Sequence, residues 1–418
     1  MKILVVGATG FIGKSIYKNL AEEGYDVIAG VRFPQKFDGN AISIDFLTLK
    51  NNTEFIQQIK GFDIIINAVG IIAPKYGQSF KQMHTIAPIT LFDIAKEAGV
   101  KKIVQISALG SQKGTTLYHT SKNKADEYLR TLGVEYIILH PSIVYGDDGK
   151  STALFQALAS LPFTPIIGEG SQKLQPITID DLVVTVQKSI PPHNKNLELD
   201  VVGEEPVSYK ELLQNFRKWL GYKSTKTMSL PTFGINIIGK ILDEPTVHQD
   251  NIVMLNEGST ADVKPLARFL GYTPISFKEK LSKNKANNAQ KLYASLYLIR
   301  PLLRIIIGVV WIWSGIVSSF LYPQPLALEL LHEIGIPVGL DIPLLYVASF
   351  LDIGIGILTI IGYRIQALLI FQIIVISVYT LVLSLLAPYH WLHPFGPVLK
   401  NIPLILSIYI LGRLEEYR

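Results

Sequence analysis

Four long apolar runs at the back of the chain constrain its fold more than any other feature of the sequence. They cover residues 301–321, 342–362, 365–387 and 398–412, and the last is short. A run of about 20 apolar residues has the length of a helix that crosses a bilayer. Only 11 of the 73 charged residues lie after position 300. The sequence therefore predicts an all-α bundle of four transmembrane helices behind a polar front part.

A glycine-rich turn opens the front part. The apolar run Lys2 to Val6 is followed at once by Gly7-Ala-Thr-Gly10-Phe-Ile-Gly13, and apolar residues at helical spacing come next. This order predicts a strand, a turn and a helix. Such glycines allow a tight turn, a close approach to a pyrophosphate and close packing of helix on strand, with the helix N-terminus facing the anion. An ordinary βα turn is the alternative, but the position after the first strand favours a nucleotide site.

Short runs rich in Ile and Val recur along the front part, and helical patterns separate most of them. They imply a parallel sheet covered on both faces, which is the doubly wound α/β (Rossmann) fold. Helix-like stretches in 147–280 predict a smaller substrate lobe. We expect a nucleotide-binding domain over 1–280, a basic linker over 281–296 and a transmembrane domain over 297–418. The predicted strands are Asp26 to Val31, Ala41 to Ile44, Asp63 to Asn67, Lys102 to Ser107 and Glu135 to His140.

Three of the predicted strand ends carry residues that suit a dinucleotide. Arg32 follows the second strand where an acid would hold a ribose hydroxyl, so NADP(H) is favoured over NAD(H). A solvated loop cation is an equal alternative for Arg32. After the third strand, Asp45 could accept from the adenine amino group and Phe46 could pack on its ring. After the fourth, Ala68-Val69-Gly70 would let the backbone run close to the cofactor.

The pair Tyr118 and Lys122 supplies a candidate acid/base. At positions i and i+4 the two side chains share a helix face, so the ammonium can favour the phenolate. Such a tyrosine can exchange a proton with a carbonyl or alcohol while a hydride moves. Ser107, at the end of the fifth predicted strand, is the candidate donor to the carbonyl, with Ser111 as the second candidate.

With these motifs, residues 1–280 resemble the extended or atypical branch of the short-chain dehydrogenase/reductase superfamily. Further matching segments are Ile106-Ser-Ala108, His140-Pro-Ser-Ile-Val-Tyr-Gly146 and Gln175-Pro-Ile-Thr-Ile-Asp-Asp181. The set is most similar to the subgroup that contains the nicotinamide-binding accessory subunit of respiratory complex I, some members of which hold the cofactor without turning it over. The family's catalytic Ser/Thr usually falls where this chain has Ala108 and Leu109. The resemblance implies an NADP(H) site at Gly7, Thr9, Gly10, Phe11, Ile12, Gly13, Arg32, Asp45, Ala68 and Gly70, closed by Pro141 and Ser142.

The back part resembles the DoxX-like family of small four-helix membrane proteins, most recognisably at His393-Pro-Phe-Gly-Pro and Lys400-Asn401. If all four runs span, five arginines fall on one side of the membrane, and this bias places the enzyme body and both termini in the cytoplasm. The segment 278–291 is basic and is either a linker on anionic headgroups or a solvated surface helix. The five arginines are Arg300, Arg304, Arg364, Arg413 and Arg418.

Asp352 lies within the second apolar run, where a carboxylate is costly unless it faces the bundle interior. It could handle protons, or it could be a protonated group bonded to a neighbouring Ser or Thr. His390 and His393 are too few to predict a metal site, and no metal ligand is proposed. Lys and Arg are scattered rather than clustered in a stripe, which argues against nucleic acid and suits a membrane surface. Cysteine is absent, which agrees with a reducing compartment.

These features together predict an oxidoreductase held in the bacterial inner membrane, with no cleavable signal visible. It would use NAD(P)H to act on an apolar substrate such as a quinone, an isoprenoid or a lipid intermediate. The alternative is a non-catalytic NADPH-binding module that senses the cofactor or steadies a membrane complex. A transporter gated by the cofactor is a third possibility, which rests on Asp352 alone.

Overall fold

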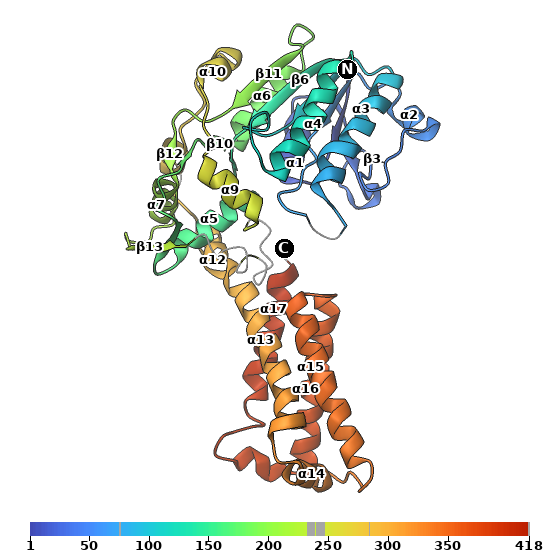
Figure 1. Ribbon diagram of the computed structural model, residues 1–418, viewed down its shortest axis with the longest axis vertical. Helices are drawn as coiled ribbons and strands as arrows, with labels where there is room; N and C mark the ends of the chain where they lie inside the picture. Colours follow the sequence, from blue (N-terminus) through green and yellow to red (C-terminus); the bar gives the residue numbers. More distant parts are fainter. Residues whose placement is uncertain (75–76, 232–238, 240–246, 284, 417–418) are drawn as a thin grey trace. The chain divides into compact units, whose positions relative to one another are not determined.

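The computed structural model describes residues 1–74, 77–231, 239, 247–283 and 285–416 of the chain. These residues form two compact units, Met1–Ser295 and Leu296–Arg418. The first unit holds a parallel sheet and a smaller lobe, and the second is a helical bundle (Figure 1). Arg418, one of the arginines that flank the apolar runs, lies outside the described residues.

A seven-stranded sheet is the centre of the first unit, and its order is β11-β6-β5-β4-β1-β2-β3. Every neighbouring pair is parallel. The strand order reverses between β1 and β4, and in such sheets ligands bind beyond the carboxyl ends of the strands at this point. The predicted doubly wound fold is thus confirmed. Its strands are β1 Lys2–Val6, β2 Asp26–Val31, β3 Ala41–Ser43, β4 Ile64–Asn67, β5 Lys102–Ile106, β6 Glu135–Pro141 and β11 Leu197–Val201.

Alternation of side chains along the strands builds two cores, one on each face of the sheet. In β1, Ile3 and Val5 belong to one buried cluster, while Leu4 and Val6 belong to the other. This is the period of two that a strand buried on both faces requires. The first cluster is covered by α1 Phe11–Glu22, α6 Ile179–Ser189 and α10 Lys264–Leu270, and the second by α2 Thr53–Ile59, α3 Ala87–Glu97 and α4 Leu117–Thr131.

The smaller lobe has a third core, rich in aromatic residues around Phe216 and Phe277. Residues 281–283 and 288–296 of the stretch expected as a basic linker are helical, and its Leu281, Ala286 and Ala294 join this core. The lobe's helices are α5 Lys150–Ser160, α7 Tyr209–Trp219, α9 Gln249–Glu257, α11 Phe277–Lys283 and α12 Asn288–Tyr297. Its strand pairs are β8 Thr164–Ile167 with β13 Thr227–Leu230, β9 Lys173–Leu174 with β12 Val207–Ser208, and β7 Val144–Tyr145 with β10 Ile177–Thr178.

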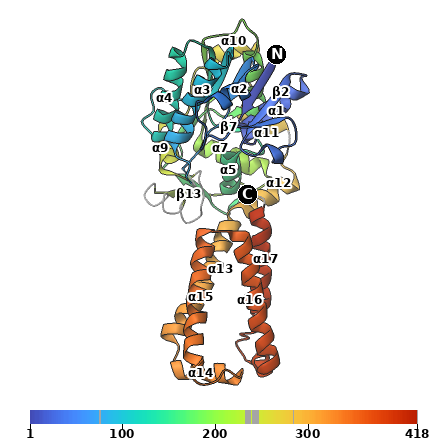
Figure 2. The same ribbon diagram turned by 90° about the vertical axis from the view of Figure 1, so that its right-hand side faces the viewer.

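Four long helices make up the bundle of the second unit (Figure 2). Within the part of the chain that the structure describes, three segments are long and apolar enough to cross a membrane, namely 288–321, 341–361 and 365–386. The fourth helix, α17, has 16 residues and is therefore about 24 Å long, short of the roughly 30 Å of a bilayer core. The elements are α13 Ile299–Ile316 with the π-helical turn η3 Val317–Leu321, α14 Gln324–Glu333, α15 Asp341–Ile361, α16 Ile365–Leu386, η4 Pro388–Leu392 and α17 Asn401–Glu416.

Glycines bring α13 and α15 into close contact. A Cβ at Gly315 would lie 2.4 Å from the carbonyl oxygen of Ser349, and one at Gly356 would lie 2.5 Å from that of Gly308. Small residues at such contacts let membrane helices pack backbone to backbone.

A group of polar side chains is buried within the apolar core of the bundle. The indole Nε1–H of Trp311 donates to Oε1 of Gln372 at 2.9 Å, and Nε2 of Gln372 donates to Oγ1 of Thr359 at 2.8 Å. Asp352 is buried on the same helix as Thr359 and accepts from Oγ of Ser314 at 3.4 Å. Buried polar groups in a bilayer must find partners inside the protein. Trp311, Gln372 and Thr359 provide them for one another, while Oδ1 of Asp352 has no hydrogen-bond partner among the described residues.

Opposite ends of the bundle carry different ionic contacts. Arg304 is 2% exposed and lies 3.7 Å from the carboxylate of Glu415, which also lies 4.0 Å from Arg300. At the other end, His390 lies 3.5 Å from the carboxylate of Glu333.

Candidate cofactor and active site

The turn after β1 has a backbone that only glycine fits. Gly7 has a φ of +88°, which side chains rarely adopt. A Cβ at Gly13 would lie 2.2 Å from the carbonyl oxygen of Gly7, so helix α1 can lie against the turn only because residue 13 has no side chain. This is the close helix-to-strand packing that the glycine spacing predicts.

The N-terminus of α1 is open to an anion. Gly10 is the N-cap, so no side chain accepts from the first backbone N–H groups, and no acidic residue lies in the first turn. Unpaired N–H groups and the positive end of the helix dipole favour a phosphate here. The residues present therefore fit the pyrophosphate of a dinucleotide. Phe11, at the start of α1, lies against Gly146, where a Cβ would come within 2.7 Å of its ring.

Arg32 and Asp45 form an ion pair at the carboxyl ends of β2 and β3, with 3.3 Å between Nε and Oδ1. Both were predicted to contact the cofactor, and the structure brings them together. Asp45 also accepts from the N–H of Leu47 at 3.0 Å. Phe46 is only 3% exposed and belongs to the core beneath this edge, so the structure does not bring its ring to the surface where adenine would lie.

Pro141 ends β6 and Ser142 follows it, on the other side of the switch point. Oγ of Ser142 donates to the carbonyl of Gln175 at 2.5 Å. The hydroxyl thus ties the end of β6 to the smaller lobe. Ala68, Val69 and Gly70 follow β4, and the N–H of Ala68 donates to the carbonyl of Val6. The backbone of this segment therefore runs beside the glycine turn, as the small residues predict.

Tyr118 and Lys122 lie on the first turns of α4, beside the end of β4. A Cβ at Gly70 would lie 3.5 Å from Nζ of Lys122 and 3.7 Å from Nε2 of His84. Nζ of Lys122 donates to the carbonyl of Ile106 at 3.1 Å and lies 5.8 Å from the centre of the Tyr118 ring. The turn after β4 and the tyrosine–lysine pair therefore share one site.

Burial changes the acidity of both members of the pair. It raises the pKa of Tyr118 to about 12 and lowers the pKa of Lys122 to about 8, because a low-dielectric environment penalises the charged form of each group. At neutral pH the phenol of Tyr118 keeps its proton. It is ready to give a proton to a developing alkoxide, which is the task of a general acid.

His84 was not predicted, yet it lies against the pair. Its Nε2 accepts from the N–H of Ile71 at 3.0 Å, so Nδ1 carries the proton and meets Oγ of Ser121 at 3.1 Å. Burial lowers its pKa to about 2, which keeps the ring neutral. The His84 ring packs edge-to-face on Tyr118, with 5.3 Å between ring centres. His84 belongs to the π-helical turn η2 Lys81–Ile86, an irregularity that recurs at functional sites.

Ser107 faces the protein interior. Its hydroxyl donates to the carboxylate of Asp126, which is fully buried on α4, and it lies 3.4 Å from Oγ of Ser111. Ser111 in turn lies 3.3 Å from Nδ1 of His140. Both serines proposed to polarise a substrate carbonyl are therefore held in one buried polar chain, which reaches the protein surface at Glu198, 3.2 Å from Nε2 of His140.

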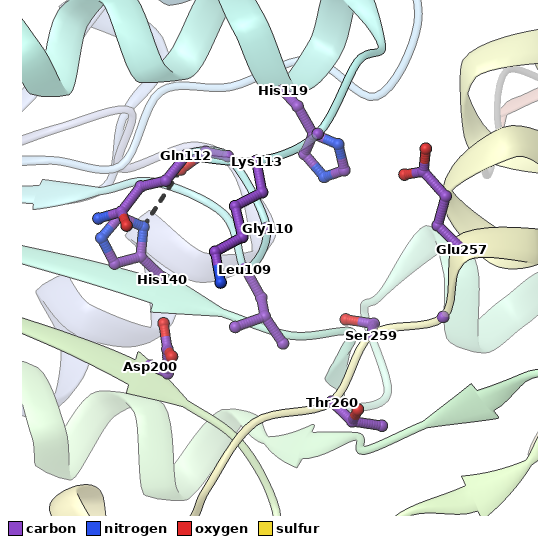
Figure 3. Close-up of a pocket in the computed structure, with 13 residues that line it drawn as sticks. Leu109, Gly110, Gln112, Lys113, His119, His140, Asp200, Glu257, Ser259 and Thr260 are labelled. Atoms are coloured by element: carbon purple, nitrogen blue, oxygen red, sulfur yellow. Dashed lines mark hydrogen bonds between the residues drawn. The ribbon is translucent and has the colours of Figure 1, made fainter.

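A cavity of about 390 Å³ lies beside this chain, beyond the carboxyl ends of β5, β6 and β11. Figure 3 shows His119 and Glu257 facing it from opposite sides, with His140 and Asp200 at its far end. His119 follows Tyr118 in α4, and their ring centres are 5.7 Å apart. The cavity therefore adjoins the acid/base pair.

His84, Asp126, His119 and Glu257 could not be singled out from the sequence, because none belongs to a motif with fixed spacing. Only the register of α4, set by Tyr118 and Lys122, could have pointed to Asp126, four residues further on. Among the described residues, no three His, Asp or Glu side chains come close enough together to hold a metal ion.

Comparisons with known proteins agree with this site. Residues 7–162 match the NAD(P)H-binding family model, and residues 308–409 match the DoxX-like family. Among solved structures, an NADPH-dependent quinone oxidoreductase from Escherichia coli, complexed with NADPH, superposes with a TM-score of 0.55 at 19% identity. That alignment covers 67% of this chain and 99% of the enzyme, which shows a shared fold.

Two curated relatives match the front part. A ceramide reductase of Caulobacter vibrioides is 23% identical over 248 residues, which is 58% of this chain and 77% of the relative. The mitochondrial NADH dehydrogenase (ubiquinone) 1 alpha subcomplex subunit 9 of Mus musculus is 24% identical over 283 residues, which is 62% of this chain and 72% of the relative. The chain thus joins a doubly wound domain that matches the NAD(P)H-binding family model to a helical bundle that matches the DoxX-like family.

Proposed function

We propose that this protein is a membrane-held reductase that uses NADPH to reduce a carbonyl group of a lipid-like substrate. The observation that carries the proposal is the placement of Tyr118 and Lys122 beside Gly70. There a protonated phenol and an ammonium meet the edge of the sheet where a dinucleotide binds in this fold.

The roles of the residues follow from this placement. The glycine turn and the start of α1 hold the pyrophosphate, and the bound nicotinamide supplies the hydride. Tyr118 gives its phenolic proton to the carbonyl oxygen as negative charge develops there. Lys122 stabilises the phenolate that remains, and neutral His84 holds the tyrosine ring and the turn after β4 in place.

The preference for NADPH over NADH rests on Arg32. Its guanidinium is partly exposed and can pair with a 2′-phosphate through charge-assisted hydrogen bonds. The ion pair with Asp45 orients the guanidinium but also competes with the phosphate for it.

The lipid-like substrate is proposed from the architecture and from a relative. One similar protein is named a ceramide reductase, and the DoxX-like domain of this chain holds the enzyme at a membrane, where apolar substrates are concentrated. Quinones and isoprenoids are the competing substrate classes.

NADPH oxidation by the purified full chain tests the proposal, with short-chain ceramide analogues that bear a ketone and with short-chain quinones as substrates. Tyr118→Phe removes the proton donor and should lower the rate by roughly 10²- to 10⁴-fold, while NADPH binding, followed by fluorescence, stays nearly unchanged. A Tyr118→Phe variant with full activity would refute the acid/base assignment.

A non-catalytic NADPH-binding module is the second candidate, and one observation favours it. The hydroxyl of Ser107 is held inside the protein by the carboxylate of Asp126, so it is not presented to a substrate carbonyl. The similarity to a complex I subunit agrees with a role in steadying a membrane complex. Inactivity of both wild type and Tyr118→Phe on the whole substrate panel, with NADPH still bound, would favour this candidate.

We also propose that the first unit and both termini lie in the cytoplasm of a bacterial cell, with the bundle in the inner membrane. Arg304 and Arg300 meet Glu415 at one end of the bundle, and arginine-rich ends of membrane helices stay cytoplasmic. A reporter fused after Arg418 should therefore be cytoplasmic and one inserted near Glu333 periplasmic. A periplasmic reporter after Arg418 would show that α17 does not span.

A further inference from the structure

One end of the smaller lobe exposes large apolar side chains. Phe163, Met228 and Leu292 are 58%, 51% and 59% exposed. They come from the loop before β8, from β13 and from α12, and both ribbon views place β13 and α12 at the same end of the first unit (Figures 1 and 2). A single exposed apolar residue is ordinary, but several at one end of a unit indicate an interaction surface.

Backbone contacts bring the loop before β8 and strand β13 together. The N–H of Thr164 donates to the carbonyl of Lys226 at 3.3 Å, and Thr164 is in register with Thr227. Phe163 therefore lies beside Lys226. Because side chains alternate along a strand, Lys226 and Met228 lie on the same face.

Helix α12 joins this surface through two further contacts. Oγ of Ser160, the last residue of α5, donates to the carbonyl of Ala294 at 3.3 Å. A Cβ at Gly221 would lie 3.5 Å from Nζ of Lys291. We call the resulting surface the lobe-end face, and it comprises Phe163, Lys223, Lys226, Met228, Lys291 and Leu292.

The lobe-end face is basic. Residues 212–231 contain four Lys or Arg and no Asp or Glu. The lysines of the neighbouring helix α11 each pair with a carboxylate, whereas Lys223, Lys226 and Lys291 form no ion pair with any described residue. Exposed apolar side chains flanked by unneutralised lysines are complementary to a bilayer surface that carries anionic lipids.

The chain also keeps this face close to a bilayer. The span candidate 288–321 has 34 residues, whereas about 20 suffice to cross the hydrocarbon core. Leu292 precedes Ile299, the first residue of α13, by seven residues, and seven residues reach at most about 25 Å. Chain length alone therefore keeps Leu292 within reach of the lipid headgroups.

We propose that the lobe-end face docks on the anionic surface of the membrane that holds the bundle. Phe163 and Met228 enter the headgroup layer, and Lys223, Lys226 and Lys291 contact the lipid phosphates. The first unit is then held by a reversible contact with lipid in addition to its covalent link to the bundle. This contact uses neither the cofactor site nor the acid/base pair, so it does not depend on the proposed function.

A fluorescent probe at Met228 tests the docking in the full chain. The chain has no cysteine, so Met228→Cys can be labelled alone with bimane. The labelled protein is reconstituted into vesicles of phosphatidylcholine, or of an equal mixture with phosphatidylglycerol, that contain lipids with nitroxide-labelled acyl chains. Quenching of the bimane should be strong in the mixed vesicles and weaker without phosphatidylglycerol, because the lysines then face no net lipid charge.

The matched control for the probe is Thr131→Cys, at the exposed end of α4 and outside the lobe-end face. Its bimane should stay unquenched in both kinds of vesicle. Circular dichroism during thermal unfolding verifies that each labelled variant is folded.

The role of charge is tested by Lys223→Gln combined with Lys226→Gln in the Met228→Cys background. The ratio of docked to undocked protein should fall roughly fivefold for each lysine, which corresponds to about 1 kcal/mol per charge near an anionic surface. The control pair Lys60→Gln with Lys124→Gln removes the same charge from exposed positions outside the face and should leave the quenching unchanged.

Three results would overturn the proposal. One is equal quenching at positions 131 and 228, and another is quenching at 228 that ignores both phosphatidylglycerol and the lysine changes. The third is a probe at 228 that is shielded from iodide in water but is not quenched by the acyl chains, because a protein rather than lipid would then cover the face.

Discussion

In the NAD(P)H-binding domain the fully buried positions are mostly aliphatic, as at Ile3, Leu4 and Val5, and charged residues lie outside. The bundle also has an apolar core, but polar side chains are buried within it and its outer surface is apolar. Its interior includes Gln372 and Arg304, while its outer surface carries exposed residues such as Leu385, at 71% exposure. Inside a bilayer, apolar side chains gain nothing from burial away from water, because the lipid is itself apolar. Polar groups there must find their hydrogen-bond partners within the protein. The two units thus follow the same rule of burial in two different solvents.

The exceptions within the first unit are instructive, because two of its buried lysines differ in their partners. Nζ of Lys102 donates to three carbonyls at the C-terminal end of α6, those of Ser189, Ile190 and Pro191, and so caps that helix. Among the described residues, Nζ of Lys122 donates to one carbonyl, that of Ile106, and it faces the site beside Gly70. A well-satisfied buried lysine indicates a structural role, and a poorly satisfied one indicates a functional role.

The largest expected effect comes from removing one member of the buried ion pair between Arg304 and Glu415 in the bundle. Arg304→Met leaves the buried Glu415 with the more distant Arg300 and should lower the stability of the bundle by about 3–5 kcal/mol. The double change Arg304→Met with Glu415→Leu should recover most of the loss, since the buried carboxylate is then gone and the remaining charge of Arg300 lies nearer the solvent. Thermal unfolding followed by tryptophan fluorescence measures both. NADPH binding by the first unit serves as the control, and a single variant as stable as wild type would mean that the ion pair is dispensable.

Replacing each of the two buried lysines by Met should change the stability of the first unit in opposite directions. At pH 7, Lys122→Met should stabilise the first unit by on the order of 1–3 kcal/mol, because the charge is buried at a cost, while abolishing reduction. Lys102→Met should destabilise it by about 1–3 kcal/mol, because three buried carbonyls lose their donor. Chemical denaturation measures both. Two changes of the same sign would contradict the distinction drawn between the lysines.

The stabilisation from Lys122→Met should depend on pH. The folded-state pKa of Lys122 is about 8, below its usual 10.5, so between these values the unfolded chain binds more protons than the folded one. Wild-type stability therefore rises with pH through this window, and the advantage of the Met variant shrinks. An advantage that stays constant from pH 7 to pH 10 would show that the burial of charge is not its cause.

The smallest effect concerns the ion pair at the edge of the sheet. Arg32→Ala should remove a preference for NADPH over NADH of roughly tenfold, about 1.4 kcal/mol. Asp45→Asn should increase that preference, since Arg32 is then released from its competitor. Fluorescence titration with both cofactors decides, and equal wild-type affinities for NADPH and NADH would remove Arg32 from the site.

The fold could be predicted from sequence because its signals are local. Each sequence pattern predicts the local structure of its own segment, as do the run Lys2 to Val6, the glycines at 7 and 13, and the long apolar runs. The doubly wound sheet and the DoxX-like bundle that they predict are confirmed. The helical character of 281–296 was less visible, because its basic residues indicate an exposed segment. It folds as helix because a few apolar side chains, such as Leu281 and Ala294, reach the core of the smaller lobe.

The site was harder to predict, because its residues meet only through the fold. Tyr118 and Lys122 share one helix and could be paired from their spacing. His84 reaches Tyr118 from another helix, and nothing in its sequence neighbourhood marks it. For Ser107 the sequence gives the strand end but not the direction of the side chain, which is set by the buried carboxylate of Asp126. The assigned roles of these residues stay predictions.

The strand order of the parallel sheet also determines when the sheet can be completed during synthesis of the chain. Its last strand, β11, pairs with β6, about 60 residues earlier in the chain, so one edge of the sheet stays open until Val201 has been made. The first span candidate begins at Asn288, about 90 residues later. At roughly 5–20 residues per second, synthesis of that interval takes about 5–20 s, far longer than hairpins or helices need to form. Strand β11 can therefore pair with β6 in water before the first span candidate is synthesised. Shortening the chain between β11 and α12 would reduce the time available for this pairing.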